Sequence, residues 1–251
     1  MCGIAGMTSR DPMSADLLPI FEKYLGILEH RGPDGRGIFA DDYSLLGQTR
    51  LSVIDLEKGH QPMTNEDNTI WAAYNGEIYN YKELRQDLET RNHKFRTDSD
   101  TEVLVHLYEE LGRDLVARLN GMFAFAIWDT KRQTLLLARD RVGIKPLFYH
   151  IGRDKLTFAS EIKSLLADAM VSRELNMQGL SDYFSFLYVP EPSTIFKNIK
   201  KLPAAHTLEY VDGEVSIQRY WTIPYQQPEL REDGVHEQTI EPSQLKHYAS
   251  E

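Results

Sequence analysis

Pairs of strand-like runs joined by hairpin-length loops constrain the fold of this chain more than any other feature of its sequence. Residues 123–128 and 134–139 form one such pair, joined by Asp129-Thr130-Lys131-Arg132-Gln133. Residues 147–150 and 156–159 form a second pair, turned by Gly152-Arg153-Asp154. Strands joined by such short loops run antiparallel, because a parallel connection needs a crossover of about a dozen residues or more. The sequence therefore favours antiparallel sheets over a parallel, doubly wound sheet.

Predicted helices lie in clusters between these strands. One covers residues 16–29, where apolar side chains recur at helical spacing. Two capping-box patterns, Asn80 with Glu83 and Ser99 with Glu102, predict the starts of two more helices. Further short strands are expected at 4–7, 44–51 and 69–74, and a short helix at 161–167. The pattern indicates an α+β fold in which helices cover antiparallel sheets.

Composition and charge argue against several function classes. The 251 residues carry a formal net charge of −10 and one Lys/Arg cluster, at 197–201, so we expect no nucleic-acid partner. No apolar run approaches the roughly 18–20 residues that span a membrane, and the N-terminus shows no signal-peptide pattern. We therefore expect a cytoplasmic protein with no membrane partner. Residues 226–251, with six acidic and two basic residues, are expected to form a linker or tail.

The single cysteine, Cys2, stands beside the start of the chain, so no internal disulfide can form. A lone cysteine is usually a small apolar residue, here at the start of a strand. Its position suggests more, because removal of Met1 would leave a free α-amine next to the thiol. The amine has an ordinary pKa of about 7.7–8.0 and the thiol one of about 8.5. One residue would then supply both a nucleophile and its general base.

Several familiar site patterns are missing from the sequence. The eight histidines show no His-x-x-x-His spacing and the cysteine no Cys-x-x-Cys, so we expect no metal site. A P-loop and a Gly-x-Ser-x-Gly elbow are also absent. Residues 35–40 match the loose dinucleotide pattern Gly-x-Gly-x-x-Ala, but they follow a predicted helix rather than a strand. We interpret that match as chance.

A series of motifs along the chain resembles the glutaminase domain of class II glutamine amidotransferases, which are N-terminal nucleophile hydrolases. It is most similar to the N-terminal half of glutamine-hydrolysing asparagine synthetases. The matching stretches are Cys2-Gly3-Ile4-Ala5-Gly6, Arg31-Gly32-Pro33-Asp34, residues 50–55, Gln61-Pro62-Met63, residues 74–80, 99–103, 119–125 and 139–147. The resemblance implies a four-layer αββα sandwich of two antiparallel sheets between helical layers. It implies a glutamine amidotransferase type 2 domain at 2–223, with 224–251 as a linker or tail.

The resemblance also implies catalytic roles. Cys2 is expected to attack the side-chain amide of L-glutamine and form a γ-glutamyl thioester, with its α-amine as base. The side chain of Asn75 and the backbone N–H of Gly76 are expected to form the oxyanion hole. From the residues alone, the Asn-Gly pair would instead predict a type I′ hairpin turn.

Substrate-binding roles follow from the same resemblance. Arg50 is expected to hold the glutamine α-carboxylate, although an arginine at a strand end is more often a surface residue. Asp100 and Glu77 are expected to meet the α-amino group, although Asp100 also suits the start of a helix. The backbone of three residues is expected to line the pocket: Leu51, Val53 and Ile78. The loops 31–37 and 139–146 are expected to shape the site.

Asparagine synthetases also carry a domain that activates aspartate with ATP through a loop of the type Ser-Gly-Gly-x-Asp-Ser. No two glycines are adjacent in these 251 residues, so that loop is absent. We therefore expect no cofactor in this chain, ATP and Mg only in the absent synthetase domain, and ammonia transfer to that domain or subunit. A homodimer is compatible with the sequence. Three alternatives stay open: a non-catalytic glutamine-binding or docking module, an amidotransferase for a different acceptor, and a hydrolase for another amide.

Overall fold

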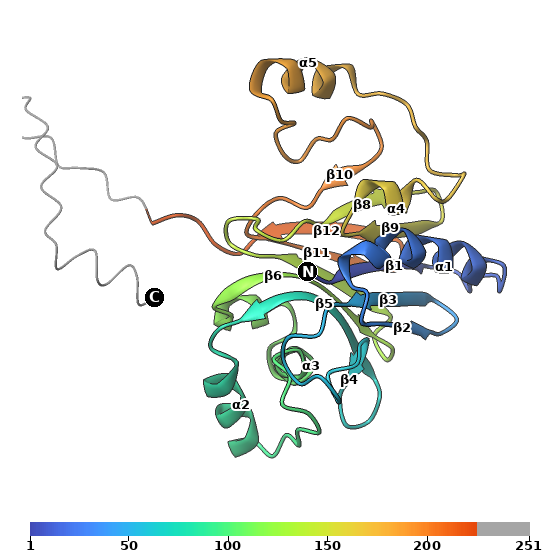
Figure 1. Cartoon of the computed structure of the whole chain (residues 1–251). Helices are drawn as coiled ribbons and strands as arrows, with labels where there is room; N and C mark the ends of the chain where they lie inside the picture. Colours follow the sequence, from blue (N-terminus) through green and yellow to red (C-terminus); the bar gives the residue numbers. More distant parts are fainter. Residues whose placement is uncertain (225–251) are drawn as a thin grey trace, which may run out of the picture. The chain divides into compact units, whose positions relative to one another are not determined.

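Two six-stranded antiparallel sheets form the centre of the described structure (Figure 1). In this computed structural model the described residues are 1–224, so the predicted tail lies outside them except for Pro224. The first sheet has the order β10 (Lys200–Lys201), β8 (Phe148–Ile151), β9 (Lys155–Ala159), β1 (Gly3–Ser9), β3 (Ser44–Arg50), β2 (Gly35–Ala40). The second has the order β12 (Glu214–Arg219), β11 (His206–Val211), β7 (Thr134–Arg139), β6 (Gly121–Asp129), β5 (Ile70–Ile78), β4 (Met63–Thr64).

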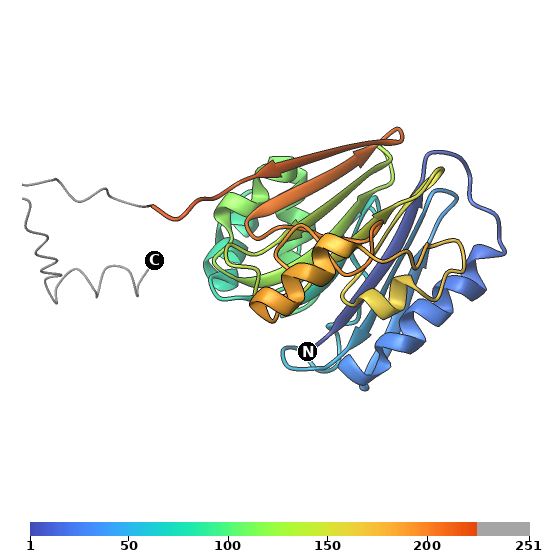
Figure 2. The same cartoon turned by 90° about the horizontal axis from the view of Figure 1, so that it is seen from above.

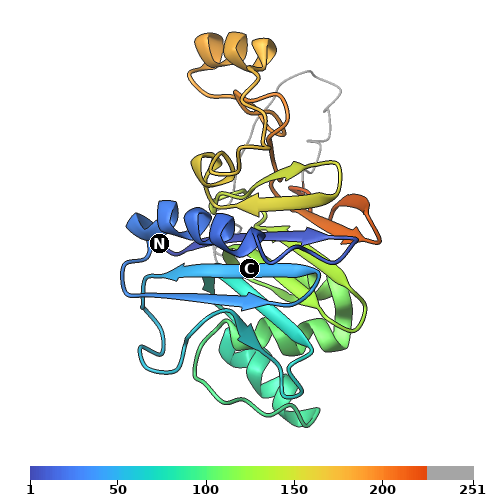
Figure 3. The ribbon, with the colours of Figure 1, turned by 90° about the vertical axis from the view of Figure 1, so that its right-hand side faces the viewer.

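Helices cover the outer faces of both sheets. On the first sheet lie α1 (Leu17–Leu28) and α4 (Ile162–Leu165), and against the second lie α2 (Tyr81–Thr90) and α3 (Glu102–Leu111). The two helical pairs flank the stacked sheets from opposite sides (Figure 2 and Figure 3). Two 3₁₀ turns, η1 (Glu29–Arg31) and η2 (Gly112–Arg118), follow α1 and α3. The remaining helix, α5 (Met177–Phe186), projects from the sheets (Figure 1).

Three buried clusters correspond to the three interfaces between these layers. Strand β6 shows how the sequence builds them, because successive side chains of a strand point to opposite faces. Phe123, Phe125 and Ile127 pack toward α3, whereas Ala124, Ala126 and Trp128 pack between the sheets. On the other sheet, α1 packs its apolar stripe against β1 and β3. The predicted α+β, four-layer αββα sandwich is therefore confirmed.

The prediction of a turn at Asn75-Gly76 from local pattern was wrong. Both residues lie inside the nine-residue strand β5, and Gly76 pairs with Phe123 of β6. A Cβ atom on Gly76 would lie 2.3 Å from the carbonyl oxygen of Met122. Glycine is therefore needed here because two strands approach closely, and not because the chain changes direction. Similarly, Gly35 to Gly37 belong to β2 rather than to the predicted loop.

Neither predicted capping box forms, although both helices begin within three residues of the predicted caps. The Asn80 side chain donates to the carbonyl oxygen of Arg118 and accepts from the backbone N–H of Asn120. The Glu102 carboxylate accepts from the backbone N–H groups of Arg96 and Thr97. Backbone groups outside the helix starts have taken up the side chains of Asn80 and Glu102, whereas the Ser99 hydroxyl accepts locally from the N–H of Thr101 at 3.2 Å.

No helix or strand was predicted between residues 168 and 220, where the structure has α5, β10 and the β11–β12 hairpin. Helix α5 carries exposed apolar side chains, including Phe184, and Leu187 follows it with 81% of its surface exposed. Apolar residues do recur at helical spacing here, at Met177, Leu180, Tyr183, Phe184 and Leu187, so the sequence carried a signal for this helix. Within the described residues, no helix has the length and hydropathy needed to cross a membrane.

Candidate active site

The structure brings all the predicted site residues except Ile78 to one cavity of about 190 Å³. This is well below the roughly 300–1,000 Å³ of pockets for drug-sized ligands, and so suits a small metabolite. The predicted residues in its wall are Cys2, Arg50, Leu51, Val53, Asn75, Gly76, Glu77 and Asp100. The wall also contains Met1, Ile54, Gly59, Gln61, Tyr74, Ser99, Thr101, Met122 and Lys145.

Cys2 lies immediately before β1, the strand that pairs with β3 and β9 in the middle of the first sheet. Its Sγ atom accepts a hydrogen bond from the backbone N–H of Leu51 at 3.4 Å and lies 3.6 Å from the carbonyl oxygen of Leu51. Its own carbonyl oxygen accepts from Nε of Arg31 at 3.0 Å. Arg31 is held in turn by Glu161 at 2.9 Å. These contacts therefore fix the position of the thiol at the N-terminal end of β1.

Burial raises the pKa of the Cys2 thiol, and the smaller lowering effects of Leu51 N–H, the chain N-terminus and Arg50 do not offset it. The thiol therefore stays protonated near neutral pH unless a base takes its proton. The nearest candidate base is its own α-amine, which becomes free only when Met1 is removed. Met1 itself lies in the cavity wall, with its Sδ atom 3.5 Å from Nζ of Lys145.

Asn75 offers the cavity a donor that has no partner among the described residues. The residue is 1% exposed, and its Nδ2 atom has no hydrogen bond. Leaving a buried amide unpaired costs about 1–3 kcal/mol, so the site gains when a ligand oxygen accepts that hydrogen bond. The close approach to β6 at Gly76, described above, fixes the backbone beside this donor.

Two carboxylates face the same cavity. Asp100 is 5% exposed, and its Oδ2 atom accepts from the Tyr74 hydroxyl at 2.8 Å and from the N–H of Ile78 at 3.0 Å. Burial raises the pKa of Asp100, and burial together with the charge of Asp100 raises the pKa of Glu77. A bound ammonium group would favour the charged form of both. Ile78, expected to line the pocket, is instead buried in the core and positions Asp100.

Arg50 fastens the loop that forms one side of the cavity. Its Nη1 atom donates to the carbonyl oxygen of Leu56, and its Nη2 atom to those of Ile54 and Asp55, at 2.6–3.2 Å. A guanidinium has five N–H donors, so two remain for a carboxylate ligand. Gly59 packs against it so closely that a Cβ atom there would lie 2.3 Å from Nη2. Arg50 thus both orders the loop and lines the cavity.

The two loops expected to shape the site contact it directly. In the first, the Asp34 N–H donates to the carbonyl oxygen of Arg50, and the Asp34 carboxylate accepts from the N–H of Ser52. In the second, the Asp140 carboxylate accepts from the N–H groups of Phe123 and Lys145.

Among the nine residues of the cavity wall that were not predicted as site residues are Gln61 and Lys145. The Gln61 side chain accepts from the N–H of Tyr74 and donates to Oγ1 of Thr101, which ties β5 to the start of α3. Both residues stand within motifs that carry the family resemblance, and that membership was the only signal that marked them.

Stacked antiparallel sheets between helical layers, with a reactive group at the start of a central strand, define the N-terminal nucleophile hydrolase fold. Residues 1–221 match the family described as "Glutamine amidotransferase domain", so the chain belongs to that family. Glutamine phosphoribosylpyrophosphate amidotransferase from B. subtilis, solved with ADP and GMP, shares the fold. It aligns with a TM-score of 0.63 and 20% identity over 88% of this chain and 49% of its own.

Two relatives show how the chain compares in length. Glutamine-hydrolysing asparagine synthetase 1 of Bacillus subtilis (strain 168) is 41% identical over 236 residues, which is 93% of this chain and 37% of that protein. Amidase chry2 of Gibberella zeae is 37% identical over 238 residues, which is 90% of this chain and 35% of that protein. The chain therefore spans little more than a third of either relative.

Proposed function

We propose that this chain hydrolyses L-glutamine to glutamate and ammonia through a γ-glutamyl thioester on Cys2. The observation that carries the proposal is the meeting, in one small cavity, of a thiol, an unpartnered buried amide, the buried carboxylate of Asp100 and the half-buried carboxylate of Glu77. A carboxylate pair and an arginine suit the head group of a free amino acid, and the amide donor suits a carbonyl oxygen that becomes charged. The family membership supports the same substrate class.

Each of these groups has a distinct role in the proposed reaction. The α-amine of Cys2 accepts the thiol proton as sulfur bonds to the amide carbon, and the carbonyl oxygen becomes an oxyanion. Nδ2 of Asn75 and the N–H of Gly76 stabilise that oxyanion. The tetrahedral intermediate then expels ammonia, which takes the proton from the α-ammonium group. Water attacks the thioester in the same way and releases glutamate and the thiol.

Asn75→Ala is expected to lower kcat by about 10²–10³-fold, because one oxyanion donor is typically worth that much. KM for glutamine should change little, since the donor stabilises charge that develops only after binding. Steady-state ammonium release measures both constants, and Asn198→Ala, an exposed asparagine, is the matched control. An unchanged kcat in a folded Asn75→Ala variant would remove Asn75 from the proposed oxyanion hole.

We further propose that the ammonia is passed to a synthetase domain or subunit that forms asparagine from aspartate with ATP and Mg. The names of the relatives support the proposal. The lone thiol supports a cytoplasmic location, where thiols stay reduced. The main alternative is hydrolysis of another amide, which the relative named amidase chry2 supports.

A single assay separates these functions. The purified chain should release ammonium from glutamine, form no asparagine from aspartate and ATP, and lose most activity on Nα-acetylglutamine, whose amine cannot pair with Asp100. Equal activity on glutamine and its acetylated form would favour the alternative amidase. No ammonium from any amide would indicate a binding module, and asparagine formation by this chain alone would contradict the need for a synthetase domain.

A further inference from the structure

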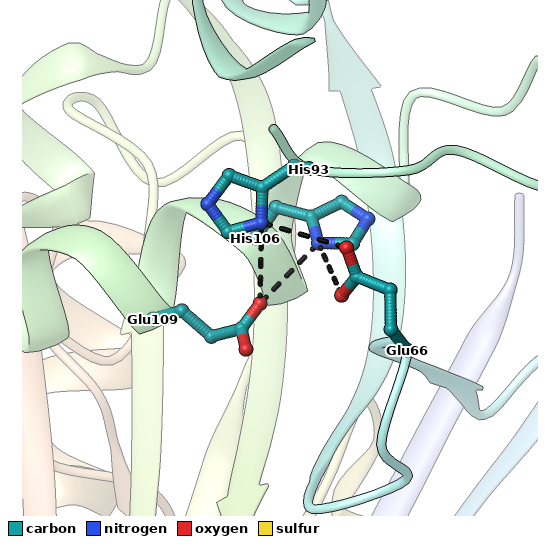
Figure 4. A group of neighbouring side chains, drawn as sticks. All are labelled: Glu66, His93, His106 and Glu109. Carbon is teal, nitrogen blue, oxygen red and sulfur yellow. Dashed lines mark hydrogen bonds and ion pairs between the residues drawn. The ribbon is translucent and has the colours of Figure 1, made fainter. Parts of the chain in front are cut away.

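A second group of titratable side chains lies at the outer helical layer beside α3 (Figure 4). Glu66 comes from the turn between β4 and β5, His93 from the loop after α2, and His106 and Glu109 from one face of α3. One possible ligand atom from each residue lies within 4.8 Å of all the others. Because three separate segments contribute, no short sequence motif predicted this group.

Several of these atoms are spaced nearly as in a tetrahedral metal site, and the whole set lies within 4.8 Å, so a bound ion would draw the widest pair closer together. Nδ1 of His106 lies 3.3 Å from an oxygen of Glu66 and 3.3 Å from Oε2 of Glu109. Nδ1 of His93 lies 3.7 Å from the other oxygen of Glu66 and 3.5 Å from Oε2 of Glu109. With bonds of about 2.0–2.2 Å, the ligand atoms of a tetrahedral zinc ion are about 3.3–3.6 Å apart. Charge-assisted hydrogen bonds are shorter, about 2.7–2.9 Å.

Outer contacts orient the four side chains toward a common centre. Nε2 of His93 lies 3.2 Å from a Glu110 oxygen. Nε2 of His106 lies 3.8 Å from an oxygen of the buried Glu102, which is beyond hydrogen-bond distance, so this carboxylate supports His106 only through its charge. A carboxylate behind the far nitrogen is the usual support of a metal-binding histidine, because it leaves the near nitrogen unprotonated. The second oxygen of Glu109 accepts from Nδ2 of Asn65 at 2.9 Å.

We propose that Glu66, His93, His106 and Glu109 bind a divalent transition-metal ion, with zinc as the best match. Two imidazoles and two carboxylates are a borderline ligand set that suits zinc better than magnesium or calcium, which prefer oxygen ligands alone. Four protein ligands fill a tetrahedral shell, so the site has no open position for a substrate. It is a structural site rather than a catalytic one.

The site would fix the segments that carry the substrate-binding carboxylate. Asp100 immediately precedes α3, and the loop from His93 to Asp100 joins a proposed ligand to the cavity wall. Glu102, behind His106, also holds the backbone of this loop through the N–H groups of Arg96 and Thr97. A bound ion would therefore stabilise the loop without touching the reacting atoms.

The test is zinc titration of chelator-treated protein, followed by calorimetry, in a Cys2→Ala background because a thiolate also binds zinc. We expect one ion per chain, and cobalt in its place should give the strong visible absorption of a tetrahedral site. At a hundredfold excess over Kd, zinc should raise the melting temperature by about 5–10 °C.

The variants are His93→Gln and Glu66→Gln, since both residues are partly exposed and less critical for folding than the buried His106. Each should weaken binding by more than the roughly 10–100-fold lost with an outer-shell partner. His150→Gln, an imidazole outside the group, should bind zinc normally. Absence of saturable binding would overturn the proposal and identify the group as protonated histidines paired with carboxylates. Stoichiometric binding that both variants retain would place the ion elsewhere and overturn it too.

Discussion

Replacement of Cys2 by alanine is expected to reduce glutamine hydrolysis to background, a loss of roughly 10⁴-fold or more. The chain has one cysteine, so no second thiol can replace the nucleophile. The substitution removes the contacts of Sγ with Leu51, but the other contacts remain, because Arg31 binds the carbonyl oxygen of Cys2 and β1 pairs through its backbone. The variant should therefore fold and keep its affinity for glutamine.

Two measurements accompany that assay. Mass spectrometry of the unmodified protein, after treatment with glutamine and rapid acid quenching, should show the added mass of a γ-glutamyl group on Cys2. Calorimetry of Cys2→Ala should show glutamine binding without heat from turnover. Normal ammonium release by Cys2→Ala would refute the proposed nucleophile, and retained binding in an inactive variant separates loss of chemistry from loss of the pocket.

Local sequence pattern predicted the elements of the fold better than the roles of individual residues. The β6–β7 and β8–β9 hairpins were correctly predicted, because a short loop between two apolar runs leaves few other arrangements. Asn75 shows the limit of local pattern. Its Asn-Gly pair favours a turn, but β5 continues through it because β6 pairs along the whole strand. That pairing joins residues about fifty positions apart, and no local propensity contains it.

In the site, too, the sequence predicted which residues come together but not the contact that each one makes. The motifs that resemble glutamine amidotransferases marked nine residues, and all of them except Ile78 line one cavity. Their spacing did not show that Arg50 uses three donors to hold its own loop, or that Asn75 Nδ2 is left unpaired. Such facts depend on which carbonyls and side chains the folded chain brings within reach. The Glu66, His93, His106 and Glu109 group was invisible in the sequence for the same reason.

Retention of Met1 is expected to lower activity by about 10²–10⁴-fold, the usual contribution of a general base. An attached residue converts the α-amine of Cys2 into an amide, which cannot accept the thiol proton. Burial raises the pKa of the thiol, so little thiolate is present near neutral pH to compensate. Met1 also lies in the cavity wall, where it takes space that glutamine needs.

The measurement compares protein that carries a protease-cleavable N-terminal extension before and after the cleavage that exposes Cys2, with intact mass confirming each form. In the cleaved form, kcat/KM should rise as pH increases through the amine pKa, ordinarily about 7.7–8.0, because the base acts only when unprotonated. Any residual activity of the extended form should rise at higher pH, as the thiol itself ionises. If the extension acted only by blocking the cavity, it would lower activity at every pH without shifting the pH profile. Equal activity and identical profiles in both forms would therefore show that the base is a group other than the Cys2 amine.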